Sequence, residues 1–158
     1  MKRAVFIVTR FDDGELHYGL LHDRRYEAYI RNIDCLDSDL LQVIDTTTSS
    51  YALEGIAVDR SGIRGFASIR LLLTTLNFIA WLRDIPIVPI STVSAALQDD
   101  HFNESVLHTI RSNPHFTEQL LPEYAGPAGV TVTTRSKKFR LLRKSYRSGE
   151  RPSASARR

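Results

Sequence analysis

Short runs of β-forming residues alternate with polar turns over the first part of the chain. Residues 4–9 (AVFIVT) form an apolar run, and residues 16–21 alternate apolar and polar positions after the turn-forming triplet Asp12, Asp13 and Gly14. Residues 26–31 alternate again after a second polar turn. This pattern predicts three strands joined by tight turns, in an antiparallel meander.

The hydrophobic period then changes to that of a helix. Leu40, Leu41 and Ile44 fall on one side of a predicted helix, which Asp37 or Ser38 can cap and which extends toward residue 50. The next apolar run, residues 53–58 (LEGIAV), is short and predicts a buried strand.

A long apolar segment follows the polar loop after that strand. Residues 66–83 predict a buried helix, and residues 85–90 (IPIVPI) predict a fifth strand whose two prolines place it near an edge or end of the sheet. Residues 92–111 predict a further helix that Pro114 ends, before an irregular stretch rich in proline and glycine.

The predicted order is therefore βββαβαβ. Three antiparallel strands followed by parallel strands with crossover helices define an α/β fold of the ribonuclease H-like type, the lobe of actin/Hsp70-type ATPases, with a mixed five-stranded sheet. Length allows one such core. We expect a lobe over residues 1–92, a reduced helical and irregular segment over 93–134, and a tail over 135–158.

The net charge of +3 conceals an asymmetry along the chain. Residues 135–158 hold ten Lys/Arg and one Glu, whereas the remainder holds eleven Lys/Arg and seventeen Asp/Glu. The tail lacks apolar periodicity, so we expect it to be disordered, and either to contact nucleic acid or only to keep the protein soluble. The cations expected to contact nucleic acid are Arg135, Lys137, Lys138, Arg140, Arg143 and Lys144.

Cysteine content and hydropathy indicate the compartment. Cys35 is the one cysteine, so no intramolecular disulfide can form. The apolar run after Lys2 and Arg3 is too short for a secretory signal, and residues 66–82 contain the polar side chains of Arg70 and Asn77, which argues against a membrane span. We therefore expect a cytoplasmic protein without membrane contact.

Between residues 52 and 92, Gly62, Phe66 and Arg70 mark a loop and the start of the helix that follows it, and a later short strand leads to Ser91 and Thr92. In the spacing of these residues and in that strand the chain resembles the TsaB (YeaZ) family, whose members take part in making threonylcarbamoyladenosine on tRNA. Ile7 and Thr9 match the first strand, and a Pro-x-Tyr-x-x-Pro pattern at residues 122–127 matches the family's ending.

The departures from this family concern the phosphate loop. Where the family has Pro-Gly-Ser, this chain has Ile63, Arg64 and Gly65, and the aspartate of the first strand is replaced by Val8. A glycine loop cradles phosphate because its N–H groups converge without a side chain in the way. In this chain the side chains of Ile63 and Arg64 occupy those loop positions. The second lobe of two-lobed relatives has no counterpart in it. We therefore expect a degenerate phosphate loop and no cofactor.

Other candidate chemistry has a plainer interpretation. His101, His108 and His115 are spaced by seven residues, whereas helical metal pairs use three or four, so surface histidines are expected. Asp12 and Asp13 fit a hairpin turn better than a nuclease site. Arg70 either meets phosphate or forms a structural ion pair within the lobe.

The resemblance implies a non-catalytic scaffold subunit. Such a subunit would bind a catalytic TsaD-type paralogue, with a TsaE-type ATPase as a possible further partner, tRNA contacted through the complex, and a homodimer as another possible state. One alternative is a ribonuclease H-like nucleic-acid-binding module that uses the basic tail, and another is a small nucleotide hydrolase, which the altered loop opposes.

The helical wheel predicts where a partner would bind. One stripe of the 66–83 helix can cover the sheet, and a second stripe lies roughly opposite, where a monomer should show charge. Either a partner covers this second stripe or the segment after Thr92 folds back over it. Together with the first helix, the predicted interface comprises Leu40, Leu41, Ile44, Leu71, Phe78, Trp81 and Leu82.

Overall fold

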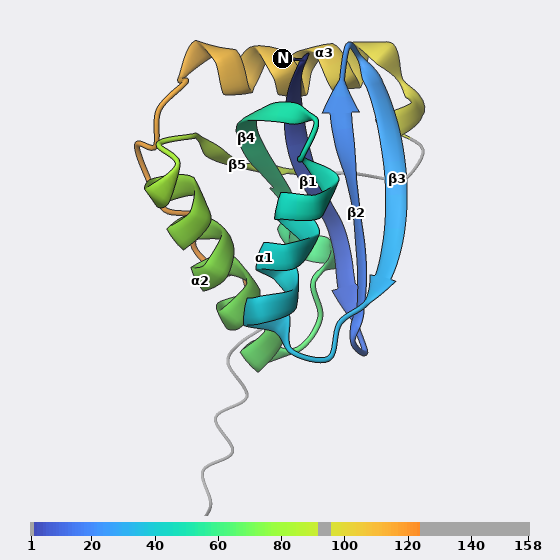
Figure 1. The fold of residues 1–158 in the computed structure, drawn as a ribbon, viewed down its shortest axis with the longest axis vertical. Coiled ribbons are helices and arrows are strands. Elements are labelled where there is room, and N and C mark those ends of the chain that lie inside the picture. Colours follow the sequence, from blue (N-terminus) through green and yellow to red (C-terminus); the bar gives the residue numbers. More distant parts are fainter. Residues whose placement is uncertain (1, 92–95, 124–158) are drawn as a thin grey trace, which may run out of the picture. The chain divides into compact units, whose positions relative to one another are not determined.

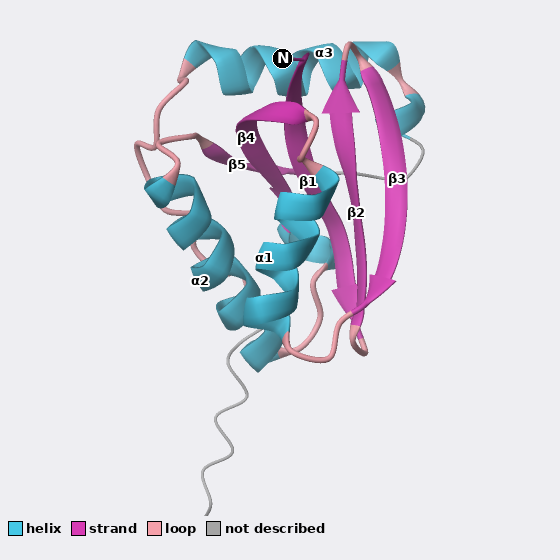
Figure 2. Cartoon of the chain, viewed as in Figure 1, coloured by secondary structure: helices cyan, strands magenta, loops and turns pink. Residues whose placement is uncertain are grey.

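The computed structural model describes residues 2–91 and 96–123 of the 158-residue chain (Figure 1). Its strands and helices follow the predicted βββαβαβ order, with one more helix after the last strand (Figure 2). Their bounds are β1 Lys2–Asp12, β2 Glu15–His22, β3 Arg25–Asn32, α1 Leu36–Thr47, β4 Tyr51–Asp59, α2 Phe66–Leu82, β5 Ile87–Ile90 and α3 Asp100–Ser112, with short 3-10 turns at Arg60–Gly62 and Ala96–Gln98.

The strands form one mixed sheet in the order β3-β2-β1-β4-β5. The first three strands are antiparallel, and β1, β4 and β5 are parallel to one another. This is the ribonuclease H-like arrangement, so the predicted fold class is confirmed. As expected, β5 lies at an edge, and Pro89 falls within it.

Both hairpins close with two-residue turns whose residues have positive φ. Asp13 and Gly14 have φ of 49° and 77°, and Asp23 and Arg24 have φ of 48° and 65°. Turns with positive φ at both positions match the right-handed twist of the flanking strands. The prediction that Asp12 and Asp13 belong to a hairpin turn is confirmed, because Asp12 pairs with Glu15 across it.

Helices cover both faces of the sheet. One face packs against α1 and α2, which lie side by side in front of the strands in Figure 1. The other face packs against α3, whose axis crosses the strands and whose Val106, Leu107 and Ile110 belong to one hydrophobic cluster with Val5 and Leu21. The third helix is therefore part of the lobe's core and not a peripheral addition.

The starts of two helices differ from the predictions. Helix α1 begins at Leu36, with Cys35 at the N-cap, because the Asp39 carboxylate accepts hydrogen bonds from the N–H groups of Asp34 and Cys35 (both 3.0 Å). The predicted caps Asp37 and Ser38 lie inside the helix. Helix α3 begins at Asp100, eight residues later than predicted, where Asp99 caps it by accepting from the His101 N–H.

Candidate functional site

The loop that precedes α2 is bound to the end of β1 through its backbone. Gly62 lies so close to β1 that a Cβ atom there would be 1.9 Å from the carbonyl oxygen of Thr9. The N–H of Arg64 donates to the carbonyl of Phe11 (2.9 Å), and Ile63 forms a bridge with Phe11 and is buried in the core. The glycine that matches the family spacing therefore serves close packing.

Other N–H groups of this loop also have acceptors within it. The Asp59 carboxylate, 3% exposed, accepts from the backbone N–H of Ser61 (3.0 Å) and from its hydroxyl (2.6 Å). The N–H of Ile63 donates to the carbonyl of Arg60 (3.3 Å). A phosphate cradle needs such N–H groups to converge on a ligand, whereas these hold the loop in shape.

Two cations near this loop, Arg64 and Arg70, lie at the surface. The Arg64 side chain is exposed, and its Nε lies 3.7 Å from the Asp12 carboxylate. The Arg70 guanidinium lies 5.5 Å from the centre of the Phe66 ring, one helical turn away, in a cation–π contact. Among the described residues Arg70 is exposed and its contact is this aromatic one, and neither a phosphate contact nor an ion pair of Arg70 is tested.

A pocket of about 490 Å³ opens at the carboxyl ends of β4 and β5, where open α/β sheets often bind ligands. Asp59 and Glu123 contribute carboxylates to its lining, and Arg60 contributes the cation. Arg60 pairs with Glu123 (2.8 Å) and donates to the carbonyl of Leu121 (3.1 Å). Two carboxylates with one compensated cation make this pocket a poor host for phosphate.

The outer face of α2 is the second candidate region. Ile69, Leu72, Leu73, Leu76, Ile79 and Ala80 face the sheet and are buried, as the helical wheel predicted. On the opposite side, four large apolar side chains remain exposed: Leu71 (44%), Phe78 (52%), Trp81 (61%) and Leu82 (64%). We call these four residues the α2 patch.

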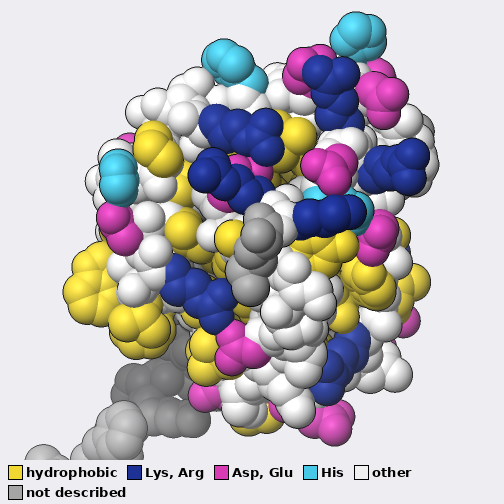
Figure 3. All heavy atoms as spheres, turned by 45° about the horizontal axis from the view of Figure 1, so that its top comes forward, with side chains coloured by type: hydrophobic (Ala, Val, Ile, Leu, Met, Phe, Trp, Pro, Cys, Tyr) yellow, Lys and Arg dark blue, Asp and Glu magenta, His cyan; other side chains and the backbone are white. Residues whose placement is uncertain are grey.

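Two of the four residues of the α2 patch are aromatic. The rings of Phe78 and Trp81 lie 6.0 Å apart, centre to centre, at an angle of 36°. Figure 3 shows hydrophobic side chains protruding at the left of the view, the side on which α2 lies in Figure 1. A protein surface with clustered exposed aromatic side chains is typical of a binding site.

The predicted contribution of α1 needs correction. Leu40 and Ile44 are 0% and 1% exposed, because both point into the core between the helix and the sheet. They cannot contact a partner while the lobe is folded. Leu41 faces outward and is 41% exposed, so it is the predicted α1 residue that remains available at the surface.

Residues 113–123 fold back along one side of α2. The Asn77 side chain donates to the carbonyl of Leu120 (2.9 Å) and accepts from its N–H (2.7 Å), and Leu120 is buried. At the end of α2, the Asp84 carboxylate contacts His115 (2.7 Å) and the Phe116 N–H (3.2 Å). The predicted fold-back therefore occurs beside the α2 patch and leaves the patch exposed.

The hydrogen bonds at this end of α2 change the pKa of Asp84. They lower the pKa of the Asp84 carboxyl, and the bond with His115 contributes more than the bond from the Phe116 N–H.

Between α2 and the returning segment lies a groove of about 360 Å³ lined by Thr74, Asn77, Phe78, Trp81, Phe116 and Gln119. Sequence reasoning missed Phe116 and Gln119, because residues after Pro114 show no periodicity that would place them on α2.

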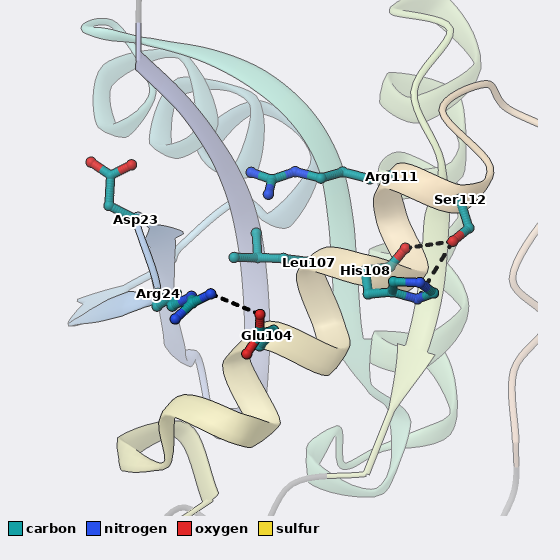
Figure 4. A pocket seen from close by; sticks show the side chains of 7 residues that line it. All are labelled: Asp23, Arg24, Glu104, Leu107, His108, Arg111 and Ser112. Carbon is teal, nitrogen blue, oxygen red and sulfur yellow. Dashed lines mark hydrogen bonds and ion pairs between the residues drawn. The ribbon is translucent and has the colours of Figure 1, made fainter.

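A third pocket lies against α3, on the opposite face of the sheet (Figure 4). Its charged residues are paired: Arg24 contacts Glu104 (2.8 Å), and Arg111 contacts Glu54 (2.9 Å). Figure 4 shows His108 beside Ser112, whose hydroxyl donates to the His108 carbonyl (2.8 Å). This pocket has the mixed, compensated charge of an ordinary solvated surface.

The predicted surface histidines are confirmed, since His101, His108 and His115 are all exposed. Within residues 2–91 and 96–123, no three His, Cys, Asp or Glu side chains are grouped so that they could hold a metal ion. None of the helices in this part of the chain has the length and apolar character needed to cross a bilayer. Thr92, Tyr124, Pro127 and the tail cations from Arg135 to Lys144 lie outside the described residues.

Comparisons with known proteins found structural likeness alone. No family model matches the chain, and no curated protein matches it. One similar solved structure is an uncharacterized protein with similarity to peptidase YEAZ from Pseudomonas aeruginosa, at 18% identity and a TM-score of 0.48 over 61% of this chain and 46% of that one. Another is YeaZ from Pseudomonas aeruginosa, at 17% identity and a TM-score of 0.48 over 65% and 50%. The chain thus spans about half the length of these two structures, and both carry the name of the family that its sequence resembles.

Proposed function

We propose that this protein is a non-catalytic scaffold subunit in tRNA threonylcarbamoyladenosine modification. It binds a catalytic TsaD-type paralogue through the α2 patch and Leu41, and activates that enzyme by holding it in its working arrangement. The observation that carries the proposal is the α2 patch, with Phe78, Trp81 and Leu82 each more than half exposed. The sequence resemblance to the TsaB family supports the choice of partner.

The loop before α2 supports a role without nucleotide chemistry. Its N–H groups at Ser61, Ile63 and Arg64 donate to acceptors in the loop and in β1. A subunit whose phosphate loop serves packing contributes to a complex through its surface. In this proposal the transferase supplies the chemistry, and a TsaE-type ATPase is a further member of the assembly.

The test is reconstitution with the transferase paralogue from the source cell. Wild-type protein should co-elute with the paralogue and increase formation of threonylcarbamoyladenosine on tRNA. Phe78→Glu or Leu82→Glu should abolish both effects, because a charge would be buried in an apolar contact. The matched control is Thr109→Glu on the exposed side of α3, which should leave both unchanged.

Two results would contradict the proposal. The first is assembly of both α2 variants with the paralogue at wild-type affinity. The second is loss of assembly in the α3 control although that variant is folded, because the effect of a charge would then not be specific to α2. Circular dichroism of each variant shows whether it is folded.

The basic tail is proposed to add tRNA contacts to the complex. Ten Lys/Arg after residue 134 can neutralise phosphates and release counterions, so the contribution should weaken as salt rises. Ending the chain before Arg135 should lower the tRNA affinity of the complex at low salt and reduce its salt dependence. Unchanged affinity at low and physiological salt would leave the tail a solubilising role.

A further inference from the structure

The two edges of the sheet differ in their capacity to pair with another strand. Strand β5 has four residues and contains Pro89. Strand β3 has eight residues without proline, and its register with β2 runs without a shift from Arg25 to Asn32. Protein sheets ordinarily protect edge strands with prolines, bulges, short length or charged side chains. Strand β3 has none of the first three, and its charged residues are Arg25, Glu27 and Arg31.

The turn between β2 and β3 determines which backbone groups of β3 face outward. His22 and Arg25 flank the two-residue turn, so they form a hydrogen-bonded pair. Pairs of this type alternate along an antiparallel ladder, so the odd-numbered residues of β3 direct their N–H and C=O groups toward β2. The even-numbered residues Tyr26, Ala28, Ile30 and Asn32 direct theirs to the open edge.

This alternation restricts how β3 could pair with β3 of a second copy. In an antiparallel arrangement related by a two-fold axis, an even-numbered residue of one copy must lie opposite an even-numbered residue of the other. One residue of the strand therefore lies opposite its own copy, next to the axis. Centring on Glu27 places two carboxylates opposite each other, and centring on Ala28 places Arg25 opposite Arg31. Centring on Tyr29 places Glu27 opposite Arg31 of the second copy, twice by symmetry.

We infer that β3 is a self-pairing edge, through which two copies of this chain join their sheets into one continuous ten-stranded sheet centred on Tyr29. Ala28 and Ile30 form the hydrogen-bonded pairs across the axis, and Glu27 and Arg31 form two ion pairs. The contact is separate from the α2 patch, so it goes beyond the proposed function.

The side chains of β3 suit this register. Ile30 is 64% exposed and Tyr29 is 39% exposed, and both gain apolar neighbours across the axis. Hydrogen bonds from His22 and from the Tyr29 hydroxyl hold the pKa of the Glu27 carboxyl below its usual value, so the carboxylate stays charged opposite Arg31. On the same face, Tyr29 stacks on Tyr18, which keeps its ring against its own subunit.

Disulfide trapping tests the register directly in the full chain. A Tyr29→Cys substitution, with Cys35→Ser to remove the exposed native thiol, places two cysteines in a non-hydrogen-bonded pair about 4.5 Å apart at Cα, within disulfide range. Mild oxidation should give a covalent dimer. The matched control Ile30→Cys with Cys35→Ser faces Ala28 of the second copy, so it should yield little dimer.

A charge exchange tests the ion pairs. Arg31→Glu places like charges opposite each other at two positions and should weaken dimerisation about tenfold or more. Adding Glu27→Arg to the same chain restores opposite charges and should bring the dissociation constant back toward the wild-type value, as measured by analytical ultracentrifugation. Phe78→Glu on α2 should leave the Tyr29→Cys dimer intact, which separates this contact from the α2 patch.

The inference is overturned by any of three results. These are a wild-type chain that stays monomeric at every concentration measured, equal trapping of the Tyr29→Cys and Ile30→Cys chains, and a charge exchange that fails to restore the dimer although both variants are folded. Loss of trapping with Phe78→Glu would assign self-association to α2 instead.

Discussion

Helices α2 and α3 cover opposite faces of the same sheet, and their outer surfaces differ in chemistry. Both bury an apolar stripe against the strands. On its outer side α3 presents charged and polar residues, among them Asp100, Glu104 and His108. On its outer side α2 presents Phe78, Trp81 and Leu82.

The difference indicates which helix has an outer surface suited to water and which has one suited to a partner. An amphipathic helix with a polar outer stripe needs no further partner, and α3 has this pattern. A helix that is apolar on both sides occurs where both sides are covered. The sheet covers the inner side of α2, and residues 113–123 cover only a flank, so the α2 patch is the surface at which association gains the most.

The largest expected effects come from the inner stripes, where the two helices are alike. Leu76→Ala on α2 and Ile110→Ala on α3 should each lower the free energy of unfolding by about 2–5 kcal/mol, because both side chains are nearly inaccessible to water. Phe78→Ala should change it by less than about 1 kcal/mol in the isolated protein. Urea unfolding of the three variants measures this contrast, and a Phe78→Ala loss as large as that of Leu76→Ala would contradict it.

The next effect concerns the flank of α2. Asn77→Ala removes both hydrogen bonds to the Leu120 backbone and should cost about 1–3 kcal/mol, because a buried peptide group loses its partners. Hydrogen exchange at Leu120 should accelerate with it. Thr74→Ala, an exposed residue on the same helix, is the matched control and should change neither quantity.

A spectroscopic effect should follow from Trp81, the one tryptophan of the chain. Its ring is 61% exposed, so emission of the isolated protein should lie at the long wavelength of a hydrated indole and be quenched by iodide. Addition of the transferase paralogue should shift emission to shorter wavelength and reduce quenching. Emission that is unchanged although the proteins co-elute would place the interface elsewhere.

The smallest expected effect is a pH dependence at the end of α2. Asp84 has a lowered pKa in the folded state, so its contribution to stability is present above the unfolded-state pKa and is lost as pH falls through the folded-state pKa. Below about pH 4, residues 113–116 should therefore detach first, which amide exchange can follow. Asp84→Asn keeps a residue that tolerates the observed φ of 48° but removes the charge, and it should abolish this pH dependence.

Periodicity was enough to predict the elements of the fold and the two stripes of α2. It could not distinguish Leu41 from Leu40 and Ile44, since all three lie within one broad arc and the direction of the core depends on how α1 packs on the sheet. Periodicity also could not predict the path of residues 113–123. The Asn77 side chain fixes Leu120 there, and the segment has no repeating pattern. The start of α1 depended on Asp39, whose carboxylate reaches back to the N–H groups before the helix.

The packing of Ile63 limits which substitutions the loop before α2 can accept. Its isoleucine side chain fills the core, and the amide of the next residue, Arg64, bonds to β1. Replacing Ile63 with a small residue would open a cavity at a cost of about 2–5 kcal/mol, a large share of the stability of such a domain. With Ile63 in the core and the Arg64 amide bonded to β1, single substitutions cannot open this loop into an anion site unless stability is first gained elsewhere.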